Sequence, residues 1–127
     1  MRRVYIMLVC CVLLVQSCRG PGTDATDVWR KIEIDPAELD GEGLRGGEGG
    51  KTAVSYEFRI PDTPECREQV KRIDPTVQFM PGSRGRIGAR EHECLCIGST
   101  HQKDYAGVLR ALAGLSCVER IIECHFE

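Results

Sequence analysis

The chain has 127 residues, enough for one small domain, and its 17 lysines and arginines nearly balance 19 aspartates and glutamates, for a formal net charge of −2. This slightly acidic balance argues against a nucleic-acid partner, because phosphate binding requires a net basic face. Eight cysteines are a high number for this length.

The first segment is organised as a secretion signal. A basic start, Met1-Arg2-Arg3, precedes an uncharged apolar run from Val4 to Val15. The run is too short for a membrane span, which needs about twenty apolar residues, and it has the length of a signal-peptide core. We therefore expect residues 1–17 to be a signal peptide that directs export.

The signal ends at Val15-Gln16-Ser17-Cys18. These residues resemble the lipobox of bacterial lipoproteins, in which an aliphatic and a small residue precede a lipid-modified cysteine, although Gln16 is unusual at its position. The resemblance implies cleavage before Cys18, acylation of Cys18 with fatty acids such as palmitate, and anchoring to a lipid bilayer of the cell envelope. Because Arg19 follows the cysteine in place of aspartate, it implies the outer membrane in a Gram-negative cell. An ordinary cleaved signal is the alternative.

The fate of Cys18 decides whether the remaining thiols can all pair. Cys10 and Cys11 belong to the signal, and the folded part holds Cys66, Cys94, Cys96, Cys117 and Cys124. Export permits disulfides. With Cys18 acylated, at least one thiol of the folded part stays unpaired within the chain, whereas with Cys18 free all of them could pair.

Residues 18–50 carry little apolar patterning. From Asp40 to Gly50 the chain is mostly glycine and charge, and such a segment buries too little surface to offset its ordering entropy. We therefore expect a lipid-anchored flexible linker over residues 18–50. Val28–Ile34 is the exception: it is expected to be a loosely packed extended segment, with a short strand or a partner-docking peptide as alternatives.

Residues 51–127 have the patterning of a folded domain. Thr52 to Ile60 alternates between apolar and polar side chains, as a half-buried strand does, and Pro61–Glu65 carry helix-start residues. The predicted elements are a strand at 52–60, a helix to about 73, strands at 76–80 and 92–99, a helix at about 102–115 and a strand at 117–126.

This order of elements is the ferredoxin-like βαββαβ pattern. It predicts an α+β sandwich with both helices on one face of a four-stranded antiparallel sheet, whose strands lie in the order fourth, first, third, second. The last strand is expected to turn inward Val118, Ile122, Cys124 and Phe126. The open face is expected to carry Ser55, Glu57, Arg59, Gln78, Glu119, Ile121, Glu123 and His125.

The spacing His92-x-Cys94-x-Cys96 places three potential metal ligands on one face of a strand. Cys94 and Cys96 lie about 6.6 Å apart by strand rise, close enough to share a soft metal such as copper or zinc. His92 lies about 13 Å from Cys96, too far for the same ion unless the strand bulges. The alternative is that both cysteines are small packing residues.

Cys66 lies in the first turn of the first predicted helix, where a thiol is more reactive, but no Cys-x-x-Cys motif accompanies it. The topology places Cys66 and Cys117 at the same edge of the domain. We therefore predict a Cys66–Cys117 disulfide, with Cys66–Cys94 as the next candidate. Cys96 and Cys124 are not expected to pair, because an intervening strand separates them by about 9.6 Å.

The loop at 82–90 carries Arg84, Arg86 and Arg90 among glycines. We expect a solvated hairpin, whose alternative role is to contact an anionic lipid head group or an acidic partner.

No serine elbow, paired-carboxylate motif or histidine pair of a metalloprotease occurs in the sequence. The sequence therefore favours a non-enzymatic lipoprotein, without a cofactor, whose domain binds another protein of the envelope. The partner would contact the polar sheet face or add a strand to an exposed edge. The alternative is a periplasmic metal- or thiol-handling protein that uses Cys94 and Cys96.

Overall fold

The computed structural model describes residues 25–125. The predicted signal peptide, the lipobox-like Cys18 and Phe126 lie outside these residues. The described chain is an α+β fold with three α-helices and two antiparallel sheets, one of two strands and one of four. None of its helices is both long and apolar enough to cross a membrane.

The larger sheet has the strand order β4-β5-β3-β6, and every neighbouring pair is antiparallel. Its strands are β3 (Ser55–Pro61), β4 (Gln78–Pro81), β5 (Glu93–Ser99) and β6 (Ile121–Cys124). This is the spatial order predicted from the sequence, with β3 and β5 in the centre and β4 and β6 at the edges.

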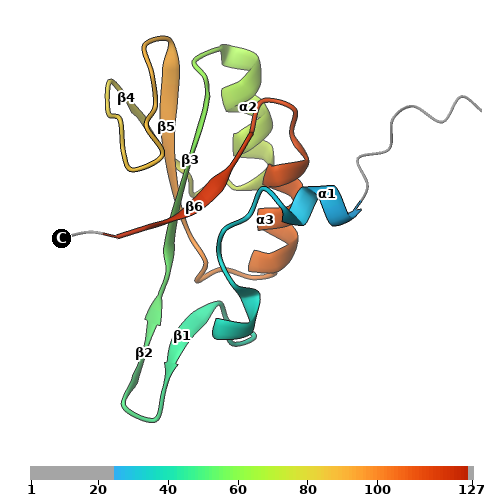
Figure 1. Ribbon diagram of the computed structural model, residues 1–127, viewed down its shortest axis with the longest axis vertical. Helices are drawn as coiled ribbons and strands as arrows, with labels where there is room; N and C mark the ends of the chain where they lie inside the picture. Colours follow the sequence, from blue (N-terminus) through green and yellow to red (C-terminus); the bar gives the residue numbers. More distant parts are fainter. Residues whose placement is uncertain (1–24, 126–127) are drawn as a thin grey trace, which may run out of the picture.

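Two helices, α2 (Pro64–Ile73) and α3 (Tyr105–Gly114), cover one face of this sheet (Figure 1). The start of α2 follows the predicted chemistry: the hydroxyl of Thr63 accepts a hydrogen bond from the Cys66 N–H at 3.3 Å, and Pro64 occupies the first turn. The helix ends before Pro75, because the residue preceding a proline is disfavoured in the helical conformation.

The core lies between these helices and the sheet. Its largest fully buried apolar side chains come from both layers and from the last loop: Tyr56, Phe58, Ile60, Val70, Leu112, Val118 and Ile121. Cys94 and Cys96 lie in the same core with no exposed surface.

In the last predicted strand, Val118 is buried in the core as predicted, but the facing predicted for Ile122 and Cys124 is wrong by one residue. Ile121 faces the helices opposite Phe58, whereas Ile122 and Cys124 lie opposite Glu57 and Ser55 on the other face. The strand begins only at Ile121, and the turn before it breaks the alternation that the prediction counted from Val118.

The predicted flexible linker differs from the structure over residues 25–50. This segment contains α1 (Ala25–Trp29), the 3-10 turn η1 (Pro36–Glu38), β1 (Leu44–Gly47) and the start of β2 (Gly50–Ala53). Its apolar residues Val28, Ile32 and Ile34 are buried in the core, where they favour ordering of the segment.

The same segment is hydrogen-bonded to the edge of β6. The Glu33 N–H donates to the Ile121 carbonyl at 2.8 Å, and the Ile121 N–H donates to the Lys31 carbonyl at 2.7 Å. These bonds make a short parallel bridge, so part of the β6 edge that was expected to be open is paired.

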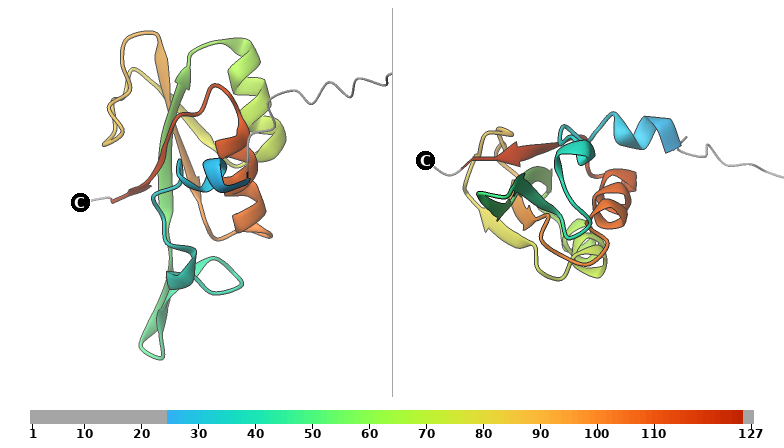
Figure 2. Two further views of the ribbon diagram at one scale, coloured as in Figure 1. Left: turned by 45° about the vertical axis from the view of Figure 1, so that its right-hand side comes forward. Right: turned by 90° about the horizontal axis from the view of Figure 1, so that it is seen from below.

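The loop between β4 and β5 lies against the sheet face opposite the helices (Figure 2). Ile87 and Ala89 are buried there against Leu95. Glu57, expected on an open face, is only 2% exposed, and its Oε1 accepts a hydrogen bond from the Ile87 N–H at 2.6 Å. The loop is therefore a packed cover and not a solvated hairpin.

Candidate functional site

The β1–β2 hairpin projects beyond the end of the four-stranded sheet (Figures 1 and 2). β1 and β2 pair from Leu44↔Ala53 to Gly47↔Gly50, and all four residues of β2 are exposed. An isolated hairpin of this size is marginal in water, so contacts at its base must hold it in place.

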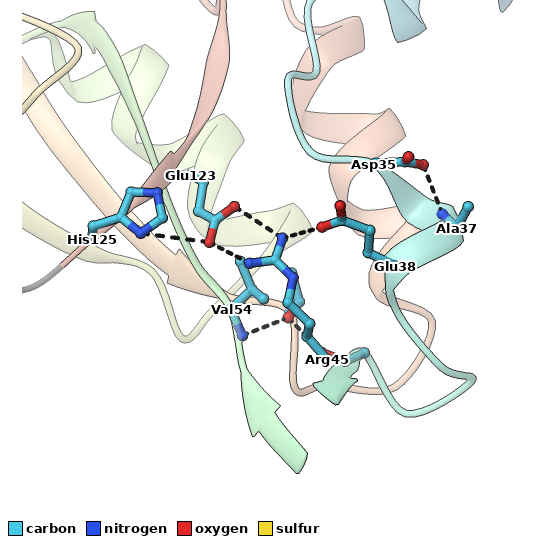
Figure 3. Close-up of polar contacts among 9 residues, drawn as sticks. Asp35, Ala37, Glu38, Arg45, Val54, Glu123 and His125 are labelled. Carbon is cyan, nitrogen blue, oxygen red and sulfur yellow. Dashed lines mark hydrogen bonds and ion pairs between the residues drawn. The ribbon is translucent and has the colours of Figure 1, made fainter. Parts of the chain in front are cut away.

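Arg45 makes the central contact at the base of the hairpin (Figure 3). Its Nη1 and Nη2 donate to the two carboxylate oxygens of Glu123 on β6 at 2.6 and 2.9 Å, and Nη2 lies 2.8 Å from Glu38 Oε2 in η1. The hydrogen bonds from Arg45 lower the pKa of Glu123 against the opposing effect of burial. Such a two-pronged arginine–carboxylate contact fixes both position and direction.

Thr100 holds the hairpin from the other side. Its buried hydroxyl donates to the Gly43 carbonyl at 2.6 Å and accepts from the Val54 N–H at 3.1 Å. Gly43 has φ +76°, and a Cβ built there would lie 1.8 Å from the Thr100 carbonyl oxygen. Only glycine fits this approach of the two backbones.

Asp40 closes the loop that enters β1. Its carboxylate accepts hydrogen bonds from the Glu42 and Leu44 N–H groups at 2.9 and 3.0 Å, and Lys51 Nζ lies 2.7 Å from its Oδ2. The Lys51 hydrogen bond and the backbone bonds lower the pKa of Asp40 to about 2. Asp40 therefore stays ionised at neutral pH and keeps both ends of the hairpin together.

A hollow of about 490 Å³ lies beside Arg45, between the hairpin and the end of the sheet. It is lined by Arg45, Gly46, Gly50, Thr52, Ala53, Val54, Ser55, Glu123, Cys124 and His125. His125 Nδ1 lies 3.7 Å from Glu123 Oε1 (Figure 3). Since Arg45 faces two carboxylates, the cluster carries a net negative charge when His125 is neutral.

Arg84 and Arg90, two of the three arginines singled out in the sequence, lie together. Both line a shallow hollow of about 390 Å³ with Ser83 and Glu91, whereas Arg86 does not line it. Glu91 at the rim offsets part of the positive charge, so the hollow is a weaker anion site than three converging arginines would make.

Cys94 and Cys96 lie beside one another in the core, as the strand spacing predicted, whereas His92 does not join them. His92 precedes β5 in a left-handed conformation, with φ 68°, so it does not continue the strand face of Cys94 and Cys96. Burial raises the thiol pKa of both cysteines, which disfavours the thiolate that binds a metal. Within residues 25–125, no three histidine, cysteine, aspartate or glutamate side chains are grouped to hold a metal ion.

Cys66 and Cys117 lie beside one another, as the topology predicted. Burial and a hydrogen bond with the Cys66 thiol raise the pKa of Cys117 to about 11. Both are free thiols in this structure. The disulfide between them stays a prediction.

Sequence reasoning missed Arg45, Glu38 and the hairpin itself. The available signal was Gly47-Glu48-Gly49-Gly50, a turn-forming run between two short segments of strand length. Arg45 lies in the glycine-rich stretch Asp40–Gly50, and Glu38 lies just before it, so a composition typical of a linker concealed their pairing.

Comparisons with protein-family models, with curated proteins and with solved structures found no match to this chain.

Proposed function

We propose that this chain is a small membrane-tethered lipoprotein of the cell envelope, whose domain binds another protein through the β1–β2 hairpin. The observation that carries the proposal is that the β1–β2 hairpin is exposed but held in place at its base. Every residue of β2 is exposed, while Arg45, Asp40 and Thr100 anchor the hairpin. A pre-ordered surface loses less entropy when a partner binds.

The charges at the base of the β1–β2 hairpin suit a partner that presents an extended segment with a basic side chain. Among the described strands β2 pairs only with β1, so its second edge can accept an added strand. The net negative charge of Glu38 and Glu123 around Arg45 favours a lysine or arginine of the partner beside the hollow. Backbone hydrogen bonds between the added strand and β2 would supply affinity, and the basic side chain would fix the register of the added strand.

We further propose that residues 51–127 form a ferredoxin-like sandwich, to which α1, η1 and β1 are additions. The strand order β4-β5-β3-β6, the antiparallel pairing, and the positions of α2 after β3 and α3 after β5 support this arrangement. The fold alone implies no activity, because many functions share it.

The membrane tether rests on sequence alone. The apolar run from Val4 to Val15 and the lipobox-like residues that end at Cys18 support export and acylation. Two or three acyl chains anchor a protein stably, whereas one chain binds only marginally.

The test is site-specific photocrosslinking in intact cells of the source. A photoreactive residue is placed at exposed Thr52 on β2 or, as a matched control, at exposed Arg110 on α3. We expect a discrete protein adduct from position 52 and none from position 110. Arg45→Ala should reduce the adduct several-fold, and Arg45→Lys, which keeps the charge but loses the two-pronged contact, should reduce it less. Equal yields from both positions, no adduct at all, or no effect of Arg45→Ala would contradict the proposal.

A further inference from the structure

Two half-exposed thiols meet at the start of α2, at a place that the proposed hairpin function does not use. Cys66 lies in the first turn of α2, where its N–H is capped by the Thr63 hydroxyl at 3.3 Å. Cys117 lies in the turn between α3 and β6, and its Sγ is 3.8 Å from Oε1 of Gln69. Cys66 and Gln69 are three residues apart on one helix face, so Cys117 packs against the face that presents Cys66.

The two thiols differ in surroundings. Cys117 is hydrogen-bonded to the Cys66 thiol, and burial together with that bond raises the pKa of Cys117 to about 11. Cys117 therefore holds its proton at neutral pH. Cys66, in contrast, lies in the first turn of α2, so no preceding helical turn lies over it.

The other described cysteines lack this combination. Cys94 and Cys96 have no exposed surface. Cys124 lies on the opposite sheet face, where burial and a hydrogen bond with Glu57 raise its pKa to about 11. Only Cys66 and Cys117, among the cysteines of residues 25–125, are both half-exposed and in contact with a second thiol.

We propose that Cys66 and Cys117 form a thiol–disulfide exchange site whose substrate is a disulfide, with Cys66 as the attacking thiol and Cys117 as the resolving thiol.

The exchange proceeds in two balanced steps. The Cys66 thiol loses its proton and attacks one sulfur of the substrate disulfide, so a mixed disulfide forms, the substrate S–S bond breaks, and the departing thiolate takes up a proton. Cys117 then loses its proton and attacks Cys66 Sγ, which forms the Cys66–Cys117 disulfide and releases the second substrate thiol. Two electrons and two protons pass from the domain to the substrate, and the reverse reaction oxidises a dithiol.

Lys31 is placed to assist the second step. Its Nζ donates to the Val118 carbonyl at 2.9 Å, next to Cys117, and its charge acts to lower the pKa of Cys117 against the larger effect of burial. A nearby cation stabilises the thiolate that Cys117 must become when it resolves the mixed disulfide.

The test is a redox titration of the full chain with reduced and oxidised glutathione, followed by acid quenching, alkylation and peptide mapping. We expect a reversible two-electron transition that converts Cys66 and Cys117 from free thiols to one disulfide within the range of glutathione ratios. Cys117→Ser should accumulate a glutathione mixed disulfide on Cys66. Cys66→Ser should slow the reaction with oxidised glutathione at least ten-fold, and the matched control Cys124→Ser should leave the transition unchanged.

Three outcomes would overturn the proposal. A Cys66–Cys117 bond that stays oxidised at every ratio would be a static structural disulfide, a pair that never oxidises would have no exchange activity, and an adduct of Cys117→Ser on another cysteine would exclude Cys66 as the attacking group. Thermal melts of each variant separate loss of exchange from loss of the fold. Neither Cys66 nor Cys117 belongs to the hairpin or lines the hollow beside it, so the two proposals stand or fail separately.

Discussion

Asp74 is a buried carboxylate that, within residues 25–125, accepts four hydrogen bonds and makes no ion pair. Tyr56 Oη and Gln102 Nε2 donate to its Oδ2 at 2.6 and 3.1 Å, and the Thr76 hydroxyl and N–H donate to its Oδ1 at 2.6 and 2.9 Å. Burial alone raises the pKa of Asp74, but these donors outweigh it and leave the pKa below its usual value. The contact joins β3 to the end of α2 and the start of the loop before α3.

The lowered pKa of Asp74 makes part of the stability depend on pH. The ionised form is favoured more in the folded than in the unfolded chain, so its contribution is complete above the unfolded pKa of about 4 and is lost as pH falls through the folded value. We predict that Tyr56→Phe lowers the free energy of unfolding by about 1–3 kcal/mol at pH 7 and by less at low pH. Urea denaturation at pH 7 and pH 3 measures both values.

Tyr105→Phe is the matched control for Tyr56→Phe. Tyr105 is also a buried tyrosine, but within residues 25–125 its hydroxyl makes no side-chain hydrogen bond. Equal losses for the two variants, or a Tyr56→Phe loss that does not shrink in acid, would mean that the hydroxyl–carboxylate bond is not the cause.

At the scale of elements, the loop between β4 and β5 is fitted to the sheet at Gly85. This glycine has φ +60°, and a Cβ there would lie 2.7 Å from Leu95 Cδ1 and 3.0 Å from Glu57 Oε2. Gly88, in the same loop, has φ +75° but open space around it. A comparison of alanine substitutions at Gly85 and Gly88 therefore separates backbone strain, which both positions share, from steric crowding, which only Gly85 has.

We predict that Gly85→Ala destabilises the domain by about 1–3 kcal/mol more than Gly88→Ala, because overpacking adds to the common cost of a left-handed alanine. The added methyl group also pushes the loop from Glu57, so the Ile87 amide should exchange with deuterium faster in Gly85→Ala. Chemical denaturation and hydrogen exchange provide the two measurements. Equal stability and equal Ile87 protection in the two variants would refute the packed-cover description.

The elements that the sequence predicted well are those whose signals are local. The alternation from Val54 to Ile60 gives β3, and Thr63 with Pro64 sets the start of α2. The last strand was misread because its face depends on where the turn after Cys117 ends, which alternation alone does not reveal. The antiparallel strand order was predictable because few connections satisfy the handedness rules.

The candidate site was less predictable because it depends on contacts between distant residues. Arg45 meets Glu123, which lies 78 residues further along the chain, and neither residue has a motif around it. Ile32 pairs with the β6 edge 89 residues away, so Val28–Ile34 could be recognised as apolar but not placed. The proximity of Cys66 and Cys117 followed from topology, whereas the position of His92 did not, because its left-handed conformation lies just before the strand and alternation does not reveal it.

At the scale of the whole molecule, the proposed acylation of Cys18 would tether the domain to a membrane. We predict that the mature wild-type chain begins at Cys18 and carries fatty acyl chains, and that Cys18→Ser abolishes both cleavage at this point and acylation. Intact mass spectrometry of the purified protein measures the N-terminus, the acyl mass and the number of free thiols in one experiment. A mature chain without acyl mass, or one that begins elsewhere, would indicate an ordinary signal peptide.

The continuity of β2 with β3 has a mechanical consequence. Gly50–Ala53 runs through Val54 into Ser55–Pro61, and β3 is hydrogen-bonded to β5 on one side and to β6 on the other. A force applied to the β1–β2 hairpin along the direction of β2 therefore pulls β3 parallel to its neighbours. The hydrogen bonds that join β3 to β5 and β6 then bear the force simultaneously and do not break one after another. Force applied at the hairpin is carried directly into the best-supported strand of the protein.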